Sequence, residues 1–286
     1  MEWLKHLSQA IDYIEDNLDN DISYDKAAQI ACCSTYYFQR MFSYVAGIPL
    51  SDYVRCRRMT KAAFELQISD IKVMEIGSKY GYTSPTAFNR AFHNVHGVSP
   101  TEARMEGTKL NSYTRLSFSV NITGGESMRY RVETKDPIRV VGTRVSLVEE
   151  AEQNFITVPK FWDTTLKGST FLKICELTNQ DPIGILGITV YEKPKEIYYY
   201  IAASTDKEAP KKLYEYQIPA ATWIIFECEG RYPESIQTIF KRFLTEWLPF
   251  SGYEYAELPD IEVYPVNNGK LKGGNSEVWI AVKKSE

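Results

Sequence analysis

Two segments fifty residues apart decide the fold: Ser34-Thr-Tyr-Tyr-Phe-Gln-Arg-Met-Phe-Ser-Tyr-Val-Ala-Gly47 and Ser84-Pro-Thr-Ala-Phe-Asn-Arg-Ala-Phe-His-Asn-Val-His-Gly97. Six of their positions are identical, including two Phe and one Val at the i, i+4, i+7 spacing of a buried helical stripe. Each segment begins with Ser, which favours the N-cap, and ends with Gly, which favours the left-handed C′ position. The pattern therefore predicts two related helices of about three turns each.

A short helical segment precedes each copy, at Tyr24 to Ala31 and at Val73 to Tyr80. Small residues lie in both segments, where a crossing helix must approach closely. A helix, a short turn and a helix with a polar outer face make the helix-turn-helix arrangement, whose second helix enters the major groove of DNA. A plain helical repeat is the alternative, but such arrays need at least three copies to bury a core, and only two are present.

The residues between the two copies, Leu50 to Leu66, read as one continuous helix roughly 25 Å long. A rigid spacer of that length could hold two reading helices close to the ~34 Å repeat of successive major-groove faces. A first helix, with apolar residues at three- and four-residue steps from Leu4 to Leu18, closes the core of the first unit.

The net charge of −4 opposes nucleic-acid binding, but the charge is segregated along the chain. Residues 34–61 contain five basic residues and a single acidic one, whereas acidic residues gather in the first 25 positions. The basic stretch therefore predicts a local contact with DNA phosphates. Its basic residues are Arg40, Arg55, Arg57, Arg58 and Lys61.

Residues 1–108 resemble the DNA-binding domain of the AraC/XylS family of transcription regulators, in the branch that contains MarA, SoxS and Rob. The resemblance rests on Tyr37-Phe-Gln-Arg-Met-Phe, Tyr53-Val-Arg-Cys-Arg-Arg-Met, Ile76-Gly-Ser-Lys-Tyr-Gly-Tyr and Phe88-Asn-Arg-Ala-Phe. It implies an all-α domain with two helix-turn-helix units and double-stranded operator DNA as the partner, with RNA polymerase as a further candidate partner. Activation is the expected mode, and the sequence leaves repression open as the alternative. Those relatives carry other residues at Tyr36, Pro85 and Thr86, so the operator sequence does not follow.

The DNA-binding residues follow from the polar faces of the two reading helices, from the basic spacer and from the matched positions of the family. Arginines in such positions contact either guanine edges or phosphates, and the sequence does not choose between them. The predicted set is Thr35, Tyr36, Gln39, Arg40, Ser43, Arg55, Arg58, Ser84, Thr86, Asn89 and Arg90.

A polar stretch without a periodic apolar pattern separates the two halves of the chain, and we interpret it as a linker at residues 109–114. After it the sequence pattern changes from helical to strand-like. A hairpin is expected first, from Leu116–Thr123 and Met128–Glu133 around Gly124-Gly125. The remainder of residues 115–286 predicts an α+β domain of two strand-helix-strand-strand units. The first unit is predicted at 138–147, 155–166, 185–191 and 197–203, and the second at 214–229, 233–247, 261–266 and 278–282.

Glu262 lies within an otherwise apolar predicted strand, Pro259-Asp-Ile-Glu-Val-Tyr. A carboxylate that points inward needs a cation or hydrogen-bond donors, and one that points outward is merely solvated. Alternation along the strand leaves the two orientations equal. The many aromatic residues of this half are typical of strand cores, and each one is more often structural than ligand-contacting.

Residues 115–286 also resemble the GyrI-like effector-binding domain, through Pro137-Ile-Arg-Val-Val-Gly, Trp247-Leu-Pro, Pro259-Asp-Ile-Glu-Val-Tyr-Pro and Val278-Trp-Ile-Ala-Val. The match is diffuse and spans the domain. It implies an aromatic pocket with the carboxylate of Glu262 at its floor and a planar, often cationic ligand. The expected ligand-binding set is Glu262, Trp162, Tyr191, Tyr200, Phe226, Tyr264 and Trp279.

Together these readings predict a transcription regulator that is modulated by a small aromatic or cationic molecule and controls drug or stress response genes. An enzyme is not expected, because all three histidines lie in the first half and no nucleophile, metal-site or phosphate-loop motif appears. The alternatives are a GyrI-like hydrolase tethered to a DNA-binding domain, and a sequestering or gyrase-directed module.

Composition narrows the setting of the protein. No stretch reaches the ~18 apolar residues of a membrane span, the first residues lack the layout of a signal peptide, and the cytoplasm is expected. The five cysteines form no CxxC pair, so neither disulfides, nor a metal site, nor a cofactor is expected. The adjacent thiols Cys32 and Cys33 are interpreted as structural, with redox sensing as the alternative.

Overall fold

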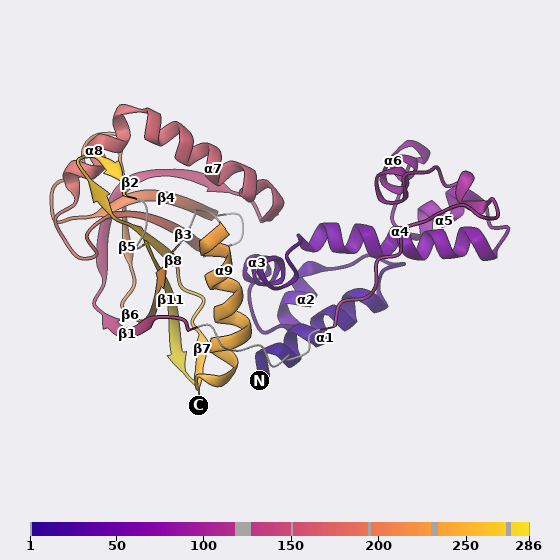
Figure 1. Ribbon diagram of the computed structural model, residues 1–286, viewed down its shortest axis with the longest axis horizontal. Helices are drawn as coiled ribbons and strands as arrows, with labels where there is room; N and C mark the ends of the chain where they lie inside the picture. The colour runs from indigo at the N-terminus through magenta and orange to yellow at the C-terminus, as the bar shows by residue number, and fades with distance from the viewer. Residues whose placement is uncertain are drawn as a thin grey trace. The chain divides into compact units, whose positions relative to one another are not determined.

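The chain folds into a helical unit, Met1–Ser119, and a strand-rich unit, Val120–Glu286. A computed structural model describes residues 2–117, 127–149, 151–193, 196–229, 234–272 and 276–285 (Figure 1). Across these residues, the helices fall short of the length and apolar character that crossing a membrane requires. An all-α unit, called the reader below, followed by an α+β domain agrees with the fold class that the sequence predicts.

The helical unit contains two helix-turn-helix units, as the internal repeat predicts. The second helix of each unit has the predicted caps. The side-chain oxygen of Ser34 accepts a hydrogen bond from the backbone N–H of Tyr37, and that of Ser84 accepts one from Ala87. The helices are α1 (Glu2–Asp16), α2 (Tyr24–Ile30), α3 (Thr35–Ala46), α4 (Leu50–Ile68), α5 (Val73–Lys79) and α6 (Pro85–His96), followed by a 3₁₀ turn at Glu102–Arg104.

Helix α4 belongs to two hydrophobic cores. Its first turns bury Leu50, Tyr53 and Val54 in a core with Phe38 and Phe42 of α3. Its later turns pack into a second core around Phe88 and Phe92 of α6, through Met59, Ala62, Ala63 and Leu66. One continuous helix is therefore the shared wall of both helix-turn-helix units, which is the spacer role expected from the sequence.

The main sheet of the strand-rich unit is antiparallel, in the order β1-β6-β11-β8-β3-β4-β2-β5 with β7 beside β11, and β9 and β10 form a separate two-stranded sheet. Helices α7 and α8 pack on β2 and β4 on one side of the centre, and α9 packs on β6 on the other. The elements are β1 (Tyr130–Lys135), β2 (Ile138–Leu147), α7 (Ala151–Lys167), α8 (Ser169–Leu177), β3 (Ile185–Lys193), β4 (Glu196–Ser204), β5 (Tyr214–Ile218), β6 (Ala221–Cys228), α9 (Glu234–Arg242), β7 (Tyr253–Tyr255), β8 (Asp260–Tyr264), β9 (Val266–Asn267), β10 (Lys270–Leu271) and β11 (Ser276–Lys284).

The two predicted pseudo-repeats are visible in the strand order. Counted in chain order within each pseudo-repeat, the second strand lies at the centre of the sheet, the third lies beside it and the first lies farthest from the centre. From the centre outward the strands are β3, β4 and β2 in the first half, and β8, β11 and β6 in the second. The halves meet where β3 pairs with β8, and there Gly187 lies opposite Glu262. Strand β5, which precedes the second half, pairs with the first half, and β1, which precedes the first, pairs with the second.

Several predicted elements differ from the structure. The single strand predicted over 214–229 is two strands, β5 and β6, because Pro219 cannot donate a ladder hydrogen bond and interrupts the run. Helix α8 was not predicted, and the helix predicted over 233–247 ends at Arg242 and continues as a wider π-helical turn to Trp247. The second arm of the expected hairpin is β1, which pairs with β6, whereas most of the first arm, at 116–123, lies outside the described residues.

Candidate DNA-reading faces and effector site

The first predicted reading face lies on α3, opposite Phe38 and Phe42. Gln39 and Arg40 lie three and four residues after Tyr36, and Ser43 lies four and three residues after them, so the four share this side of the helix. Tyr36, Gln39 and Ser43 are less than a tenth exposed in the structure, while Thr35 and Arg40 are partly exposed.

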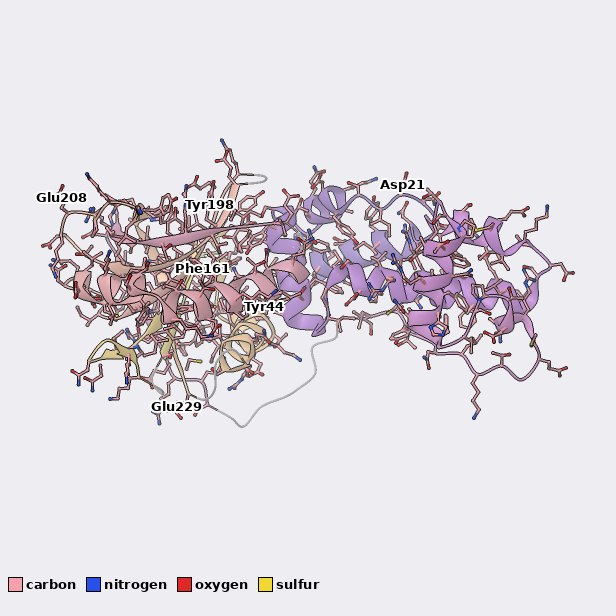
Figure 2. The ribbon with its side chains drawn as sticks, turned by 90° about the horizontal axis from the view of Figure 1, so that it is seen from above. Asp21, Tyr44, Phe161, Tyr198, Glu208 and Glu229 are labelled. Atoms are coloured by element: carbon pink, nitrogen blue, oxygen red, sulfur yellow. The ribbon has the colours of Figure 1, made fainter. Side chains whose placement is uncertain are left out.

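Arg40 and Thr35 already have partners on or near α3. Arg40 donates from Nε to the hydroxyl of Tyr44, 3.1 Å away, and its guanidinium lies 5.4 Å from the centre of that ring (Tyr44 is labelled in Figure 2). Thr35 donates to Asp25 of α2 over 2.5 Å. Arg40 is thus held along the helix by an aromatic neighbour, an arrangement that orients its planar group without neutralising it.

The second predicted reading face lies on α6 and is open. Thr86, Asn89 and Arg90 are all exposed, on the side away from Phe88 and Phe92. Ser84, the remaining predicted residue of this helix, is its N-cap and uses its hydroxyl within the fold. The exposed trio has the side-chain types that contact base edges and phosphates.

The two predicted arginines of α4 have different surroundings. Arg55 is exposed and pairs with Asp52 one turn earlier. Arg58 donates from Nε to the carbonyl of Leu18 over 2.9 Å and from Nη2 to that of Asn20 over 2.7 Å. Its Nη1 lies only 2.9 Å from where a Cβ would stand on Gly81. Arg58 therefore has a structural function at the end of α1, besides the phosphate contact predicted for it.

Arg57, the third arginine of this stretch, is committed to the interior of the helical unit. Its guanidinium donates to both oxygens of Glu15, over 2.8 and 2.7 Å, and Tyr53 donates to the same carboxylate over 2.6 Å. Burial alone would raise the pKa of Glu15, but the hydrogen bonds from Arg57 and Tyr53 outweigh it and hold the pKa below its usual range. This ion pair joins α1 to α4.

Glu262 points to the helix-covered face of the sheet, which answers the question that strand alternation left open. Its Oε2 accepts hydrogen bonds from the hydroxyls of Tyr199, at 2.7 Å, and Tyr264, at 2.8 Å. The indole Nε1 of Trp162, on α7, donates to the Tyr199 oxygen over 2.9 Å. The Trp162 and Tyr264 rings meet edge to face, 5.2 Å between centres. A half-buried carboxylate is thus surrounded by three aromatic side chains.

Gly187 provides the space for this cluster. It pairs with Glu262 across the central β3–β8 contact. A Cβ at Gly187 would lie 2.2 Å from the hydroxyl oxygen of Tyr199 and 2.7 Å from Oε2 of Glu262, far inside contact distance. The carboxylate and the phenol can therefore meet over β3 only because residue 187 has no side chain.

The structure brings three of the seven predicted ligand-binding residues together: Glu262, Trp162 and Tyr264. Tyr191 and Phe226 lie on the same face as Glu262 but further away. Tyr191 is four residues after Gly187 on β3. Phe226 is on β6, two strands from β8, and packs against Trp247 and Phe243. Tyr200 and Trp279 point to the opposite face, where they are core residues. Sequence reasoning did not select Tyr199, which contacts Glu262 directly.

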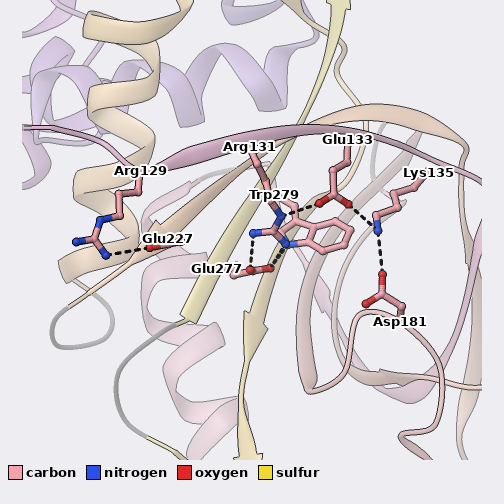
Figure 3. A network of polar contacts seen from close by, with 8 residues as sticks. All are labelled: Arg129, Arg131, Glu133, Lys135, Asp181, Glu227, Glu277 and Trp279. Atoms are coloured by element: carbon pink, nitrogen blue, oxygen red, sulfur yellow. Dashed lines mark hydrogen bonds and ion pairs between the residues drawn. The ribbon is translucent and has the colours of Figure 1, made fainter.

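The opposite face of the sheet has its own charged features. Arg131, Glu133, Lys135 and Asp181 form a chain of ion pairs, and Glu277 joins it through Arg131 and the Trp279 indole (Figure 3). A hollow of about 430 Å³ adjoins this chain. None of the predicted ligand residues lines it. Its lining is Lys135, Asp136, Pro137, Ile138, Arg139, Gln180, Asp181, Ser204, Thr205 and Asp206.

These features define a class of protein: two helix-turn-helix units on a shared spacer helix, followed by a two-fold repeated α+β domain with a carboxylate and aromatic rings at its centre. Family comparison agrees. A helix-turn-helix domain model matches residues 27–106, and the model of the integron-associated effector binding proteins matches residues 131–282. The chain belongs to the AraC-type helix-turn-helix regulators, with an effector-binding domain of the integron-associated type. It is a DNA-binding transcription regulator.

The curated relatives match the first part of the chain. The HTH-type transcriptional activator AarP of Providencia stuartii is 36% identical over 110 residues, which cover 38% of this chain and 82% of AarP. The multiple antibiotic resistance protein MarA of Escherichia coli is 32% identical over 111 residues, covering 39% of this chain and 86% of MarA.

Solved structures resemble the second part. A bacterial transcription regulation protein from Staphylococcus aureus is 20% identical, with a TM-score of 0.48, over 55% of this chain and 99% of that one. An integron cassette protein of Vibrio cholerae is 17% identical, with a TM-score of 0.39, over 54% of this chain and 95% of that one.

Proposed function

We propose that the operator binding of this regulator is controlled by an aromatic cation that the second domain holds at Glu262. The observation that carries the proposal is the Glu262 cluster at the junction of the two repeats. A cation placed there gains Coulomb attraction from a half-buried carboxylate and cation–π attraction from the rings around it. A hydrolytic role has less support, because the chain's three histidines all lie in the helical unit, leaving no imidazole for this site.

The reader contacts proposed for this function are the two polar helix faces. On α6 they are Thr86, Asn89 and Arg90, and on α3 they are Thr35, Tyr36, Gln39, Arg40 and Ser43. Arg55 and Arg58 are proposed as phosphate contacts from α4. Drug or stress response genes as targets, activation as the mode and RNA polymerase as a partner are further parts of the proposal, supported by the names of the relatives.

The ligand test compares two probes that differ in charge. N-methylacridinium is a planar cation and acridine at pH 8 is its uncharged counterpart. We expect the full chain to bind the cation at least about tenfold more tightly than acridine, a difference of about 1.4 kcal/mol. Glu262→Gln should remove the preference, while Glu254→Gln, a substitution on β7 outside the cluster, should keep it. Equal affinity of the wild-type chain for both probes would contradict the proposal.

The regulatory test adds DNA. An operator is selected from random-sequence DNA with the full chain, and its affinity is measured with and without saturating N-methylacridinium. A ligand alters DNA affinity only if it prefers one arrangement of the protein, so we expect a change of about fivefold or more in either direction. An unchanged operator affinity in the wild-type chain would refute effector control while leaving DNA recognition intact.

A further inference from the structure

The residues that follow the second helix-turn-helix unit do not leave the reader directly. Residues 110–116 run back along α4 in an extended conformation and contact both units. Residues 111–115 are exposed and Leu116 is partly buried, and backbone or side-chain groups at residues 111, 113, 115 and 116 have hydrogen-bond partners in the reader. We call residues 110–116 the strap.

The strap begins on the second unit. The side chain of Asn111 donates to the carbonyl of Val95 in α6 over 2.7 Å, and its backbone N–H donates to Nδ1 of His96, 3.3 Å away. The other ring nitrogen of His96 lies 3.1 Å from the carbonyl of Met59 in α4, which fixes the tautomer with the proton on Nε2. Leu110 packs against the second core. The first end of the strap is therefore fixed to both α6 and α4.

The middle of the strap is tied to the spacer helix. The backbone N–H of Tyr113 donates to Oγ1 of Thr60 over 3.1 Å, and the Tyr113 carbonyl accepts a hydrogen bond from Arg57. Thr60 is buried on α4, one residue after Met59, where the spacer passes from the first core to the second. The strap thus contacts α4 where the spacer helix passes from the first core to the second.

The strap ends on the first unit. The backbone N–H of Leu116 donates to the hydroxyl of Tyr53 over 3.1 Å, and the Leu116 side chain packs against the first core. Arg115 pairs with Asp12 of α1. Because Tyr53 also donates to Glu15, this end is part of the ion-pair cluster that joins α1 to α4.

We propose that the strap is part of the DNA-reading machinery: its residues are positioning residues that fix the spacing and rotation of α3 relative to α6. A single helix between two bodies can curve gently along its length. A second connection along the same span, fixed at both ends and in the middle, resists that bending. With the strap in place the two helices read their two DNA elements as one rigid site, although no strap residue need touch DNA.

The test measures how strictly the spacing of the two elements is read. An operator selected with the wild-type chain is compared with versions that have one base pair inserted or removed between the elements, and with each element alone. One base pair rotates the second element by about 34°, so a rigid reader should lose affinity about thirtyfold or more. No effector is added, so the outcome is independent of the ligand proposal.

Two variants weaken the strap from opposite sides. Asn111→Ala/Leu116→Ser removes contacts at both of its ends. Thr60→Val removes the acceptor in the middle, together with the hydrogen bond that the Thr60 hydroxyl donates to the Cys56 carbonyl within α4. We expect both to bind the intact operator less tightly, the double variant by about tenfold, and to lose less than about threefold on a one-base-pair change. Affinity for either element alone should stay within about twofold. The control is Ser112→Ala/Thr114→Ala, which should keep the full spacing penalty.

A purely structural role would produce a different pattern. If both variants retain the wild-type spacing penalty, or lose affinity for the single elements by the same factor as for the intact operator, the proposal is overturned. The spacing penalty is a ratio of affinities measured on one preparation, so a partial loss of folded protein cancels from it. Thr60→Val leaves every strap residue in place and decides the matter if the double variant does not fold.

Discussion

Gly187 determines whether the carboxylate of Glu262 can meet its phenol partners. We expect Gly187→Ala to lower the affinity for N-methylacridinium by at least about tenfold, since the new methyl would occupy the position of the Tyr199 hydroxyl. Calorimetric titration of the folded full-length variant measures this. Gly168→Ala is the matched control, because a Cβ there meets its neighbours at ordinary contact distances of 3.4 Å or more. Similar losses in both variants would argue against a local effect.

His96 makes the stability of the reader depend on pH. Burial lowers the pKa of His96 from its usual 6.5, and the hydrogen bond to the Met59 carbonyl offsets this only in part. Below about pH 6.5 the unfolded chain therefore takes up a proton that the folded chain resists, and the free energy of unfolding falls by at most about 1.4 kcal/mol per pH unit. Above that pH both states are neutral and this dependence vanishes.

The measurement is urea unfolding between pH 8 and pH 5.5. His96→Gln should remove this part of the slope, whereas His93→Gln, an exposed position on the same helix, should retain it. An identical slope in the wild-type chain and in both variants would show that other groups dominate.

The adjacent residues Tyr199 and Tyr200 show how far the sequence could predict which side chains contact Glu262. Glu262, Trp162 and Tyr264 were selected from the sequence with the help of the family resemblance, and they meet in the structure. Tyr199 and Tyr200 are adjacent, so only the register of β4 against β3 decides which of them faces Glu262. Tyr200 instead accepts a hydrogen bond from Arg144 on the other face, over 2.9 Å. A one-residue register ambiguity exchanges the two faces, and composition does not resolve it.

At the scale of elements, the two reading helices depend on their caps. Ser34→Ala and Ser84→Ala each remove one hydrogen bond to the first turn, and we expect each to cost the reader about 1 kcal/mol. Urea unfolding followed by the far-ultraviolet helix signal checks this. Ser112→Ala, in the exposed part of the strap, should change the same midpoint by much less. A cap variant as stable as the wild-type chain would contradict the expectation.

Element boundaries were predictable where local chemistry sets them. The Ser and Gly caps place α3 and α6 at the expected residues, with Gly47 and Gly97 in the left-handed conformation at φ of 72° and 75°. Helix α8 has no side-chain cap: Gly168 lies at its N-cap and Thr178 at its end. Its stability comes from packing Phe171 and Ile174 under the sheet, a tertiary effect that the local sequence does not reveal.

For the whole molecule, effector control implies reciprocity. If N-methylacridinium changes operator affinity by some factor, the operator must change N-methylacridinium affinity by the same factor, because the two binding free energies are linked. Titrating the ligand into the full chain with and without saturating operator DNA measures this. Ligand affinity that ignores the operator, in a chain whose operator affinity responds to the ligand, would show that a third species takes part.

The order of domains was predictable, because the fifty-residue repeat and the change to an alternating strand pattern can both be recognised from residues that are close together in the sequence. Other relations were not. The exchange of β1 and β5 between the two halves joins residues about as distant as Tyr130 and Phe226, and the strap joins Leu116 to Tyr53. Such pairings depend on which surfaces remain available after each half has formed, and that information is spread over the whole chain.

The two cores shared by α4 limit how this protein can evolve. Substitutions on the reading faces of α3 and α6 leave the two cores intact and can retarget the regulator to new operators. A single residue inserted between Val54 and Met59 would instead turn one reading helix by about 100° around the spacer relative to the other. We expect homologous regulators to differ in the operator sequence that they bind while keeping the length of this helix constant. Insertions and deletions should therefore be found in other parts of the gene.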